Sequence, residues 1–124
     1  MKNILIVDDE PHVAIILKQF LERSGYHVIT VLNGEQALSV IASDLPDLII
    51  TDVQMPKMNG IQLCETIKKE IPHYHNLIIM MTSRTDTDIR NWIATFPHIE
   101  LMEKPLSMRR LAARIKDYFE QITA

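Results

Sequence analysis

The sequence alternates short apolar runs with longer amphipathic stretches, and this alternation most constrains the fold. The short runs are rich in Ile, Leu and Val, which is typical of buried strands. After each run, apolar residues recur every three or four positions, as on one face of a helix. Strands that alternate with helices form a parallel sheet covered by helices on both faces. We expect strands at residues 3–7, 27–31, 47–51, 76–82 and 99–103.

The helices expected between these strands have recognisable ends and stripes. The first follows Pro11 and stops at Ser24-Gly25, where glycine suits a left-handed C-terminal cap. Asn33-Gly34 begins the second helix, and Asn59-Gly60 turns the chain and caps the third. The expected inward-facing residues are Val13, Ile16, Leu17, Phe20 and Leu21 in the first helix; Ala37, Leu38 and Ile41 in the second; Leu63, Cys64, Ile67 and Ile71 in the third; Ile89, Trp92, Ile93 and Phe96 in the fourth; and Met108, Leu111, Ala112, Ile115, Phe119 and Ile122 in the fifth.

The polarity of the five strands indicates their order in the sheet. Residues 3–7, 47–51 and 76–82 are nearly continuous apolar runs and suit the centre, whereas 27–31 and 99–103 carry more polar residues and suit the edges. Together with right-handed crossovers, this predicts a three-layer α/β domain with strand order 2-1-3-4-5, the flavodoxin-like arrangement. A chain of 124 residues fits one such domain, spanning 1–124.

Composition and charge narrow the class of protein. With 47% apolar and 23% charged residues, the chain is unlike a disordered protein. A net charge of −3 argues against direct binding to nucleic acid or anionic membrane. A single cysteine, Cys64, excludes an internal disulfide, and no run is long enough for a signal peptide or membrane span. We therefore expect a cytoplasmic protein.

Polar residues gather where the predicted strands end. In such sheets, ligands bind beyond the carboxyl ends of the strands, at the point where the winding reverses. Crowded carboxylates repel one another, and a hard divalent cation with oxygen ligands would relieve the repulsion. A lysine opposite them would hold an anion, and a threonine hydroxyl could donate to it. The residues at these strand ends are Asp8, Asp9, Glu10, Asp52, Thr82, Ser83 and Lys104.

Taken singly, each of these residues has a simpler explanation. The acidic residues could favour the N-terminus of the first helix, Thr82 could cap the fourth, and Lys104 could be a solvated surface residue. Their coincidence at one sheet edge favours a site that is complementary to a phosphoryl group and its metal ion.

Four segments carry a family resemblance: ILIVDDEP, LIITDVQMPKMNG, IIMMTS and MEKPLS. They resemble the receiver domain of CheY-like response regulators in two-component signalling, and the resemblance covers essentially the whole chain. It implies that Asp52 is the phosphoacceptor. It also implies a Mg²⁺ or Mn²⁺ ion held directly by Asp9, Asp52 and the backbone carbonyl of Gln54, with Asp8 acting through a bound water.

The resemblance assigns further roles. Lys104, expected to precede Pro105 through a cis peptide bond, would hold the phosphoryl oxygens. Thr82 would move inward after phosphorylation as a switch residue. Gln54 and Arg84 would tune dephosphorylation. The chain departs from the family at Leu101, the second switch position, where a Tyr or Phe is usual.

The implied function is signalling by a protein that catalyses only its own phosphorylation and dephosphorylation. The expected partners are a sensor histidine kinase or histidine phosphotransfer protein, and a downstream effector or fused output domain. Basic residues of the last helix (Arg109, Arg110, Arg114, Lys116) and acidic residues of preceding segments (Asp86, Asp88, Glu100, Glu103) also suggest a homodimer through the face of the last two helices and last strand.

Three other functions stay open at this stage. They are an adaptor that binds partners without phosphorylation, a metal-dependent phosphohydrolase that uses Asp52, and a flavodoxin-like FMN binder. The phosphohydrolase lacks a general acid at Gln54 and a covering cap, and the FMN binder lacks a phosphate-cradling loop after the first strand. We expect the five histidines to be solvated: His12, His27, His73, His75 and His98.

Overall fold

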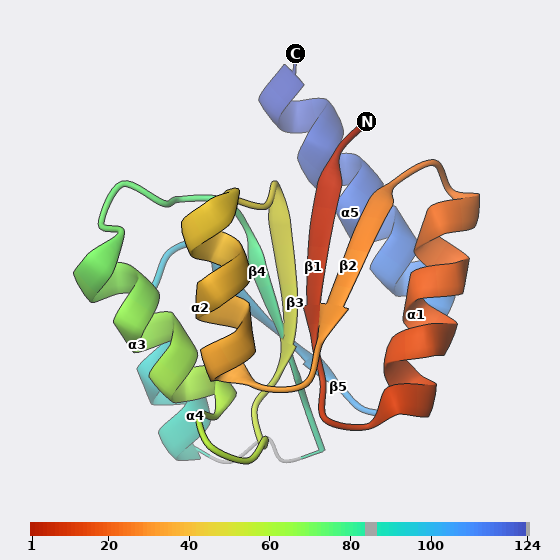
Figure 1. Cartoon of the computed structure of the whole chain (residues 1–124). Coiled ribbons are helices and arrows are strands. Elements are labelled where there is room, and N and C mark those ends of the chain that lie inside the picture. The colour runs from red at the N-terminus through yellow and green to blue at the C-terminus, as the bar shows by residue number, and fades with distance from the viewer. Residues whose placement is uncertain (84–86, 124) are drawn as a thin grey trace.

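Five parallel strands form the central layer of the molecule (Figure 1). The computed structural model describes residues 1–83 and 87–123. The strands are β1 (Asn3–Val7), β2 (His27–Val31), β3 (Leu48–Asp52), β4 (Ile78–Thr82) and β5 (Ile99–Glu103). Their order is β2-β1-β3-β4-β5, which confirms the predicted fold class and the placement of β2 and β5 at the edges.

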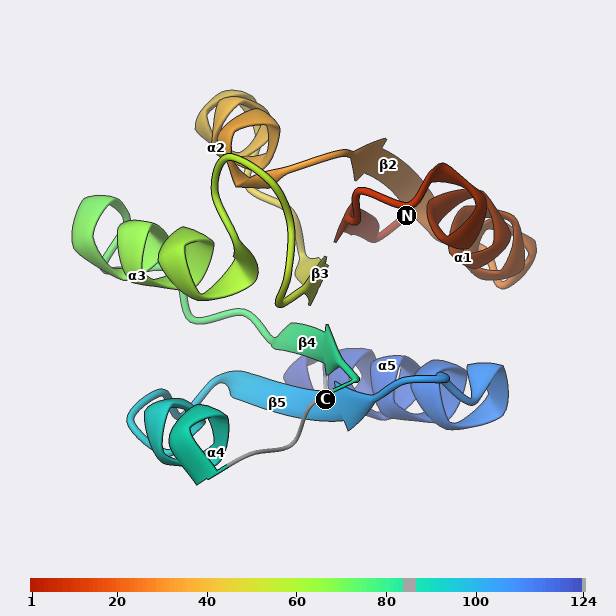
Figure 2. The same cartoon turned by 90° about the horizontal axis from the view of Figure 1, so that it is seen from below.

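Helices cover both faces of this sheet. They are α1 (Pro11–Arg23), α2 (Gly34–Ser43), α3 (Gly60–Glu70), α4 (Thr87–Ile93) and α5 (Met108–Thr123). Seen along the strands, α1 and α5 lie on one face and α2, α3 and α4 on the other (Figure 2). None of the helices in the described part of the chain is long and apolar enough to cross a membrane.

The alternation of side chains along β1 shows how the two faces are filled. Leu5 and Val7 belong to the apolar cluster under α2, α3 and α4, whereas Ile4 and Ile6 belong to the cluster under α1 and α5. Because a slip of one residue would exchange the two sets, burial on both faces fixes the strand register. The carboxyl ends of the strands are therefore held level at one edge.

Two asparagines fix the starts of α2 and α3. Asn33 accepts a hydrogen bond from the backbone N–H of Gln36 and caps α2. Asn59 caps α3 in a reciprocal arrangement with Gln62, since each side chain accepts from the other residue's backbone N–H. Both caps agree with the sequence-based expectation.

Five details differ from the sequence-based expectations. Ile16 does not face the core and is 53% exposed, because the buried stripe of α1 follows Ala14, Leu17 and Leu21. Ile122 is 50% exposed, because the last turns of α5 extend past the end of the sheet (Figure 1). Strands β3 and β4 begin one and two residues later than expected, and Asp52 is the last residue of β3 rather than the first residue after it.

The region before β5 also differs. Phe96 is buried as predicted, but it lies beyond the end of α4. The imidazole of His98 is half-buried rather than solvated, and its Nδ1 has no hydrogen-bond partner among the described residues. The rings of His75 and Phe96 lie edge-on to His98, with centroids 6.0 and 6.3 Å away. Burial lowers the pKa of His98, and the nearby His75 and Lys68 lower it further.

Candidate functional site

The carboxyl ends of β1, β3, β4 and β5 meet at one edge of the sheet, the side that faces the viewer in Figure 2. A polar pocket lies there, and most of the predicted site residues line it. Its lining residues are Asp9, Glu10, Asp52, Gln54, Thr82, Ser83 and Lys104.

Asp52 is the best-anchored carboxylate of this pocket. The residue is 6% exposed. Oδ2 accepts a hydrogen bond from Lys104 Nζ at 2.8 Å, and Oδ1 accepts one from the backbone N–H of Gln54 at 3.3 Å. The Asp52 carbonyl oxygen accepts from the hydroxyl of Thr51, and the next residue, Val53, is bonded to β4. The carboxylate is thus presented on rigid backbone at a strand end.

The loop after Asp52 is packed closely against its neighbours. A Cβ atom at Gly60 would overlap the backbone carbonyl oxygen of Asp52, so only glycine fits there. A Cβ at Gly34 would lie 2.6 to 2.9 Å from Met58, whose carbonyl oxygen accepts from Gly34 N–H. Lys57 completes the turn with a positive φ of 64°. These contacts tie the loop to the starts of both α2 and α3.

Asp8 is fully buried at the end of β1 and is only partly satisfied. Its Oδ1 accepts from the backbone N–H of Glu10 at 2.8 Å, while Oδ2 has no hydrogen-bond partner among the described residues. Burial raises the pKa of this carboxyl and the charge of Asp52 adds to the rise, against the opposing effects of the Glu10 N–H and Lys104. A buried carboxylate oxygen without a partner is costly unless a cation or water meets it.

Three carboxylates could hold such a cation together. Asp8, Glu10 and Asp52 each offer an oxygen, and these atoms lie within 4.8 Å of one another. Hard divalent cations such as Mg²⁺ prefer oxygen ligands, so the donor set and the unpartnered Asp8 oxygen fit this kind of ion. Asp9 lines the same pocket but is exposed and lies outside this group of three.

Lys104 brings a positive charge into the pocket. Its ammonium binds Asp52 and lies 3.8 Å from Glu10 Oε1. Its backbone N–H donates to the carbonyl of Thr82 at 2.8 Å, and its bond to Pro105 is cis, as predicted. Burial alone would lower the pKa of the ammonium, but the hydrogen bond to Asp52 and the surrounding carboxylates outweigh it and raise the pKa. Lys104 stays charged at neutral pH.

The remaining predicted residues fall into three groups. Thr82 is 3% exposed at the end of β4, beside the pocket. Gln54 lines the pocket with an exposed side chain. Arg84 and Asp86 lie outside the described residues.

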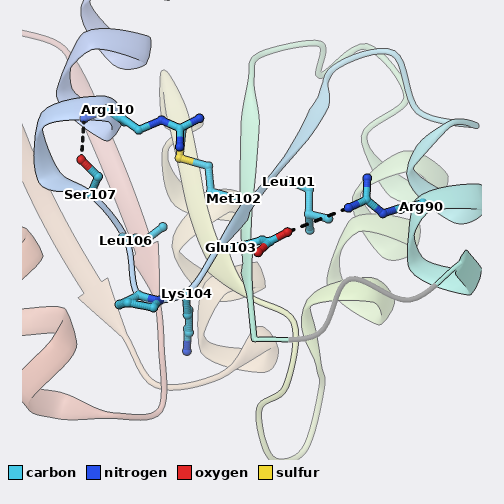
Figure 3. Close-up of a pocket in the computed structure, with 9 residues that line it drawn as sticks. Arg90, Leu101, Met102, Glu103, Lys104, Leu106, Ser107 and Arg110 are labelled. Atoms are coloured by element: carbon cyan, nitrogen blue, oxygen red, sulfur yellow. Dashed lines mark hydrogen bonds and ion pairs between the residues drawn. The ribbon is translucent and has the colours of Figure 1, made fainter.

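Leu101 is half-buried on β5, on the floor of a second pocket between α4 and α5 (Figure 3). Arg90 reaches Glu103 across one side of it, with 3.9 Å between Nη2 and Oε1, and Arg110 lies on the other side. Leu101 is the position at which the sequence departs from the resemblance, since a Tyr or Phe is expected there.

Glu10 is the site residue that the sequence reasoning undervalued. Its place directly after Asp8 and Asp9 was an available signal, but it was also consistent with a simple helix N-terminus. The structure brings its carboxylate to both the acidic group and Lys104.

Comparisons with known proteins agree with this geometry. Residues 4–116 match the family model of the response regulator receiver domain. The chain is 37% identical over 115 residues to the alkaline phosphatase synthesis transcriptional regulatory protein PhoP of Bacillus subtilis, covering 93% of this chain and 47% of that protein. It is 33% identical over 118 residues to histidine kinase P4 of Formosa agariphila, covering 95% of this chain and 8% of the kinase.

Solved structures give the same result. A two-component response regulator from Clostridium difficile superposes with a TM-score of 0.91 at 25% identity, with full coverage of both chains. The receiver domain of a signal transduction histidine kinase from Syntrophus aciditrophicus gives a TM-score of 0.88 at 32% identity, covering 98% of this chain and 92% of that one.

A sheet of order 2-1-3-4-5 with an acidic, lysine-bearing pocket at its carboxyl edge defines a signalling domain of the two-component class. This chain belongs to the response regulator receiver domain family. It spans about half the length of curated relatives such as PhoP, and much less of the kinase.

Proposed function

We propose that residues 1–124 form one cytoplasmic receiver domain that accepts a phosphoryl group on Asp52, with Mg²⁺ or Mn²⁺, from a sensor histidine kinase or histidine phosphotransfer protein. One observation carries the proposal. A rigidly held, nearly buried carboxylate is bonded to a lysine ammonium and lies beside a buried Asp8 oxygen that has no partner among the described residues.

The reaction needs little more than positioning and charge. An oxygen of Asp52 attacks phosphorus, the P–N bond to the donor histidine breaks, and its electron pair returns to the imidazole as the acyl phosphate forms. Lys104 is placed to hold the phosphoryl oxygens, and Thr82 to donate its hydroxyl to them. A bound divalent cation would neutralise the phosphoryl charge. The resemblance assigns this ion to Asp9, Asp52 and the Gln54 carbonyl, with Asp8 acting through water, and Asp9 lines the same pocket as two of the three clustered carboxylates.

The domain would also remove its own phosphoryl group. Water attack on phosphorus would return Asp52 to the carboxylate at a rate tuned by Gln54 and Arg84. Gln54 lines the pocket with an exposed side chain, as this role requires. Such a protein acts on itself alone and is no enzyme toward other substrates.

The phosphorylated state would be reported by Thr82 through the face formed by α4, β5 and α5, which binds an effector or a fused output domain. Leu101 leaves the floor of this face without the aromatic switch side chain (Figure 3). A homodimer through the same face would draw on Arg109 and Arg110, because Arg114 already pairs with Glu100 and Lys116 with Glu120 of their own chain.

An apolar groove beside the site supports a protein as the phosphoryl donor. Glu10, Ser83 and Lys104 line both this groove and the phosphoacceptor pocket, so a protein donor docked over Asp52 would also cover the groove, whereas a small donor would not. Its apolar lining residues are Val13, Ile16, Leu17, Met81, Pro105, Leu106 and Met108. Ile16 is 53% exposed at its border, a cost that burial against a partner would remove.

This arrangement predicts a separation between large and small donors. Ile16→Lys should slow phosphorylation by a histidine phosphotransfer protein by about tenfold, the size expected for losing one apolar contact in an interface, and should leave phosphorylation by acetyl phosphate unchanged. Ile122→Lys, similarly exposed at the far end of α5, is the matched control. Equal slowing with both donors would contradict a docking role.

The direct test uses acetyl phosphate or phosphoramidate with Mg²⁺ and intact mass spectrometry. We expect an adduct of about 80 Da, one phosphoryl group, that is absent from Asp52→Asn and kept in Asp47→Asn. No adduct on the wild-type chain would favour an adaptor that works without phosphorylation. An adduct retained by Asp52→Asn would move the acceptor elsewhere.

A further inference from the structure

The ammonium of Lys104 has two carboxylates within ion-pair range. Asp52 Oδ2 lies 2.8 Å away, a hydrogen bond, and Glu10 Oε1 lies 3.8 Å away, too far for one. In this structure, Lys104 therefore hydrogen-bonds to Asp52, and Glu10 is a second carboxylate within ion-pair distance.

The hydrogen bond between Lys104 and Asp52 opposes the binding of a metal ion by Asp52. Oδ1 is bonded to the N–H of Gln54 and Oδ2 to Lys104, so each oxygen already accepts a hydrogen bond. A cation that binds Asp52 must share one of these oxygens, and a lysine at 2.8 Å repels it. Movement of the ammonium away from Oδ2 would lower this repulsion and would favour binding of the cation.

We propose that Glu10 is a positioning residue that receives the Lys104 ammonium when Asp52 binds a divalent cation. This rests on the proposed function, since it concerns the same phosphoacceptor. Glu10 draws Lys104 away from Asp52 while keeping it at the pocket, where it remains available to the phosphoryl oxygens. Glu10 thus promotes cation binding by acting on Lys104.

The local structure suits Glu10 to this role. Its backbone is fixed, because its N–H donates to Asp8 and its carbonyl accepts from Val13 and Ala14 at the start of α1. Its side chain makes no capping hydrogen bond and is 50% exposed, which leaves the carboxylate able to shift by the small distance required. Substituting the side chain therefore leaves the cap of α1 intact.

A double-mutant cycle on Mg²⁺ affinity separates action through Lys104 from direct attraction of the ion. The readout is the NMR signal of the Gln54 amide, which donates to Asp52, followed as Mg²⁺ is added. Glu10→Gln should weaken Mg²⁺ binding by about three- to fivefold in the wild-type background, the size expected for one partly exposed ion pair. In the Lys104→Met background, the same change should weaken binding by less than about twofold.

Glu103→Gln is the matched control for charge. It removes one negative charge from the residue next to Lys104, but the Glu103 carboxylate faces Arg90. It should change Mg²⁺ affinity by less than about twofold.

Three results would overturn the inference. These are no loss of affinity in Glu10→Gln, an equal loss in both backgrounds, or an equal loss in Glu103→Gln. If the wild-type chain takes the phosphoryl adduct but the cycle shows no coupling, the role of Glu10 fails alone. If the wild-type chain binds no Mg²⁺, this inference and the proposed metal site fail together.

Discussion

The two ends of the sheet use buried polar groups differently. At the amino end, Asp47 Oδ2 accepts from the backbone N–H of Asn3 at 2.7 Å, and the Tyr74 hydroxyl donates to the Pro46 carbonyl at 2.6 Å. These bonds join neighbouring segments and give both side chains a hydrogen-bond partner. At the carboxyl end, the buried Asp8 keeps one oxygen without a partner among the described residues, and Asp52 shares its lysine with a second carboxylate.

The difference shows where the fold stabilises itself and where it is prepared to bind. Hydrogen bonds at the amino end contribute to folding, at about 1 kcal/mol each. At the carboxyl end, carboxylates lie close to one another, and Asp8 and Asp52 are buried. This arrangement lowers the stability of the fold, and a bound ligand can restore it. Breaking each end should therefore have different consequences.

The largest expected effect is at Gly60, at the carboxyl end. Gly60→Ala would drive a Cβ into the carbonyl of Asp52 and should destabilise the fold by about 3 kcal/mol, the upper range for overpacking. Gly25, at the amino end, has open space around it. Gly25→Ala should therefore lower the free energy of unfolding by about 1 to 2 kcal/mol, from the strain of a φ of 97° alone. Chemical denaturation of both variants measures the contrast, and equal losses would contradict the packing at Gly60.

A pH-dependent effect is expected at the amino end, where His98 Nδ1 has no hydrogen-bond partner among the described residues. Its folded pKa lies below the ordinary value of 6.5, so the unfolded chain takes up the proton first. The part of the unfolding free energy that depends on neutral His98 is fully present above pH 6.5, and it is lost as the pH falls through the folded pKa.

Unfolding free energies between pH 7.5 and about 5 should fall more steeply for wild type than for His98→Gln. If the unfolding free energy of His98→Gln fell with pH as steeply as that of wild type, burial of His98 would not be the cause of the pH dependence.

The smallest expected effect is at Lys57, in the loop after Asp52. The left-handed backbone at φ 64° is strained for lysine but not for glycine, although glycine loses more conformational entropy on folding. Lys57→Gly should therefore stabilise the fold by about 0.5 kcal/mol or less. Lys57→Ala keeps the backbone cost and should not stabilise it; a gain from alanine would point to side-chain charge instead.

Periodicity and caps were sufficient to predict the sheet order, the caps Asn33 and Asn59, and the gathering of polar residues at one edge. These features follow from local rules and from burial on two faces. The spacing of apolar residues on α1 could not exclude Ile16, because neighbouring positions on a helix lie about 100° apart and only packing decides which is covered.

The finer features of the site depend on three-dimensional contacts. No spacing rule indicates that Lys104 lies between Asp52 and Glu10, since these residues come from three different strand ends. Nor does the sequence show that one Asp8 oxygen is buried without a partner, or that His98 is sheltered by His75 and Phe96.

Buried carboxylates at the carboxyl end lower the stability of the fold, and a bound cation should restore it; a comparison of Asp8 with Asp47 tests this most directly. The measurement is the unfolding free energy of wild type, Asp8→Asn and Asp47→Asn, with and without Mg²⁺. Without Mg²⁺, Asp8→Asn should be at least as stable as wild type, and added Mg²⁺ should stabilise it much less. Asp47→Asn should lose about 1 kcal/mol and keep the full response to Mg²⁺. A destabilised Asp8→Asn that responds to Mg²⁺ as wild type does would contradict the account.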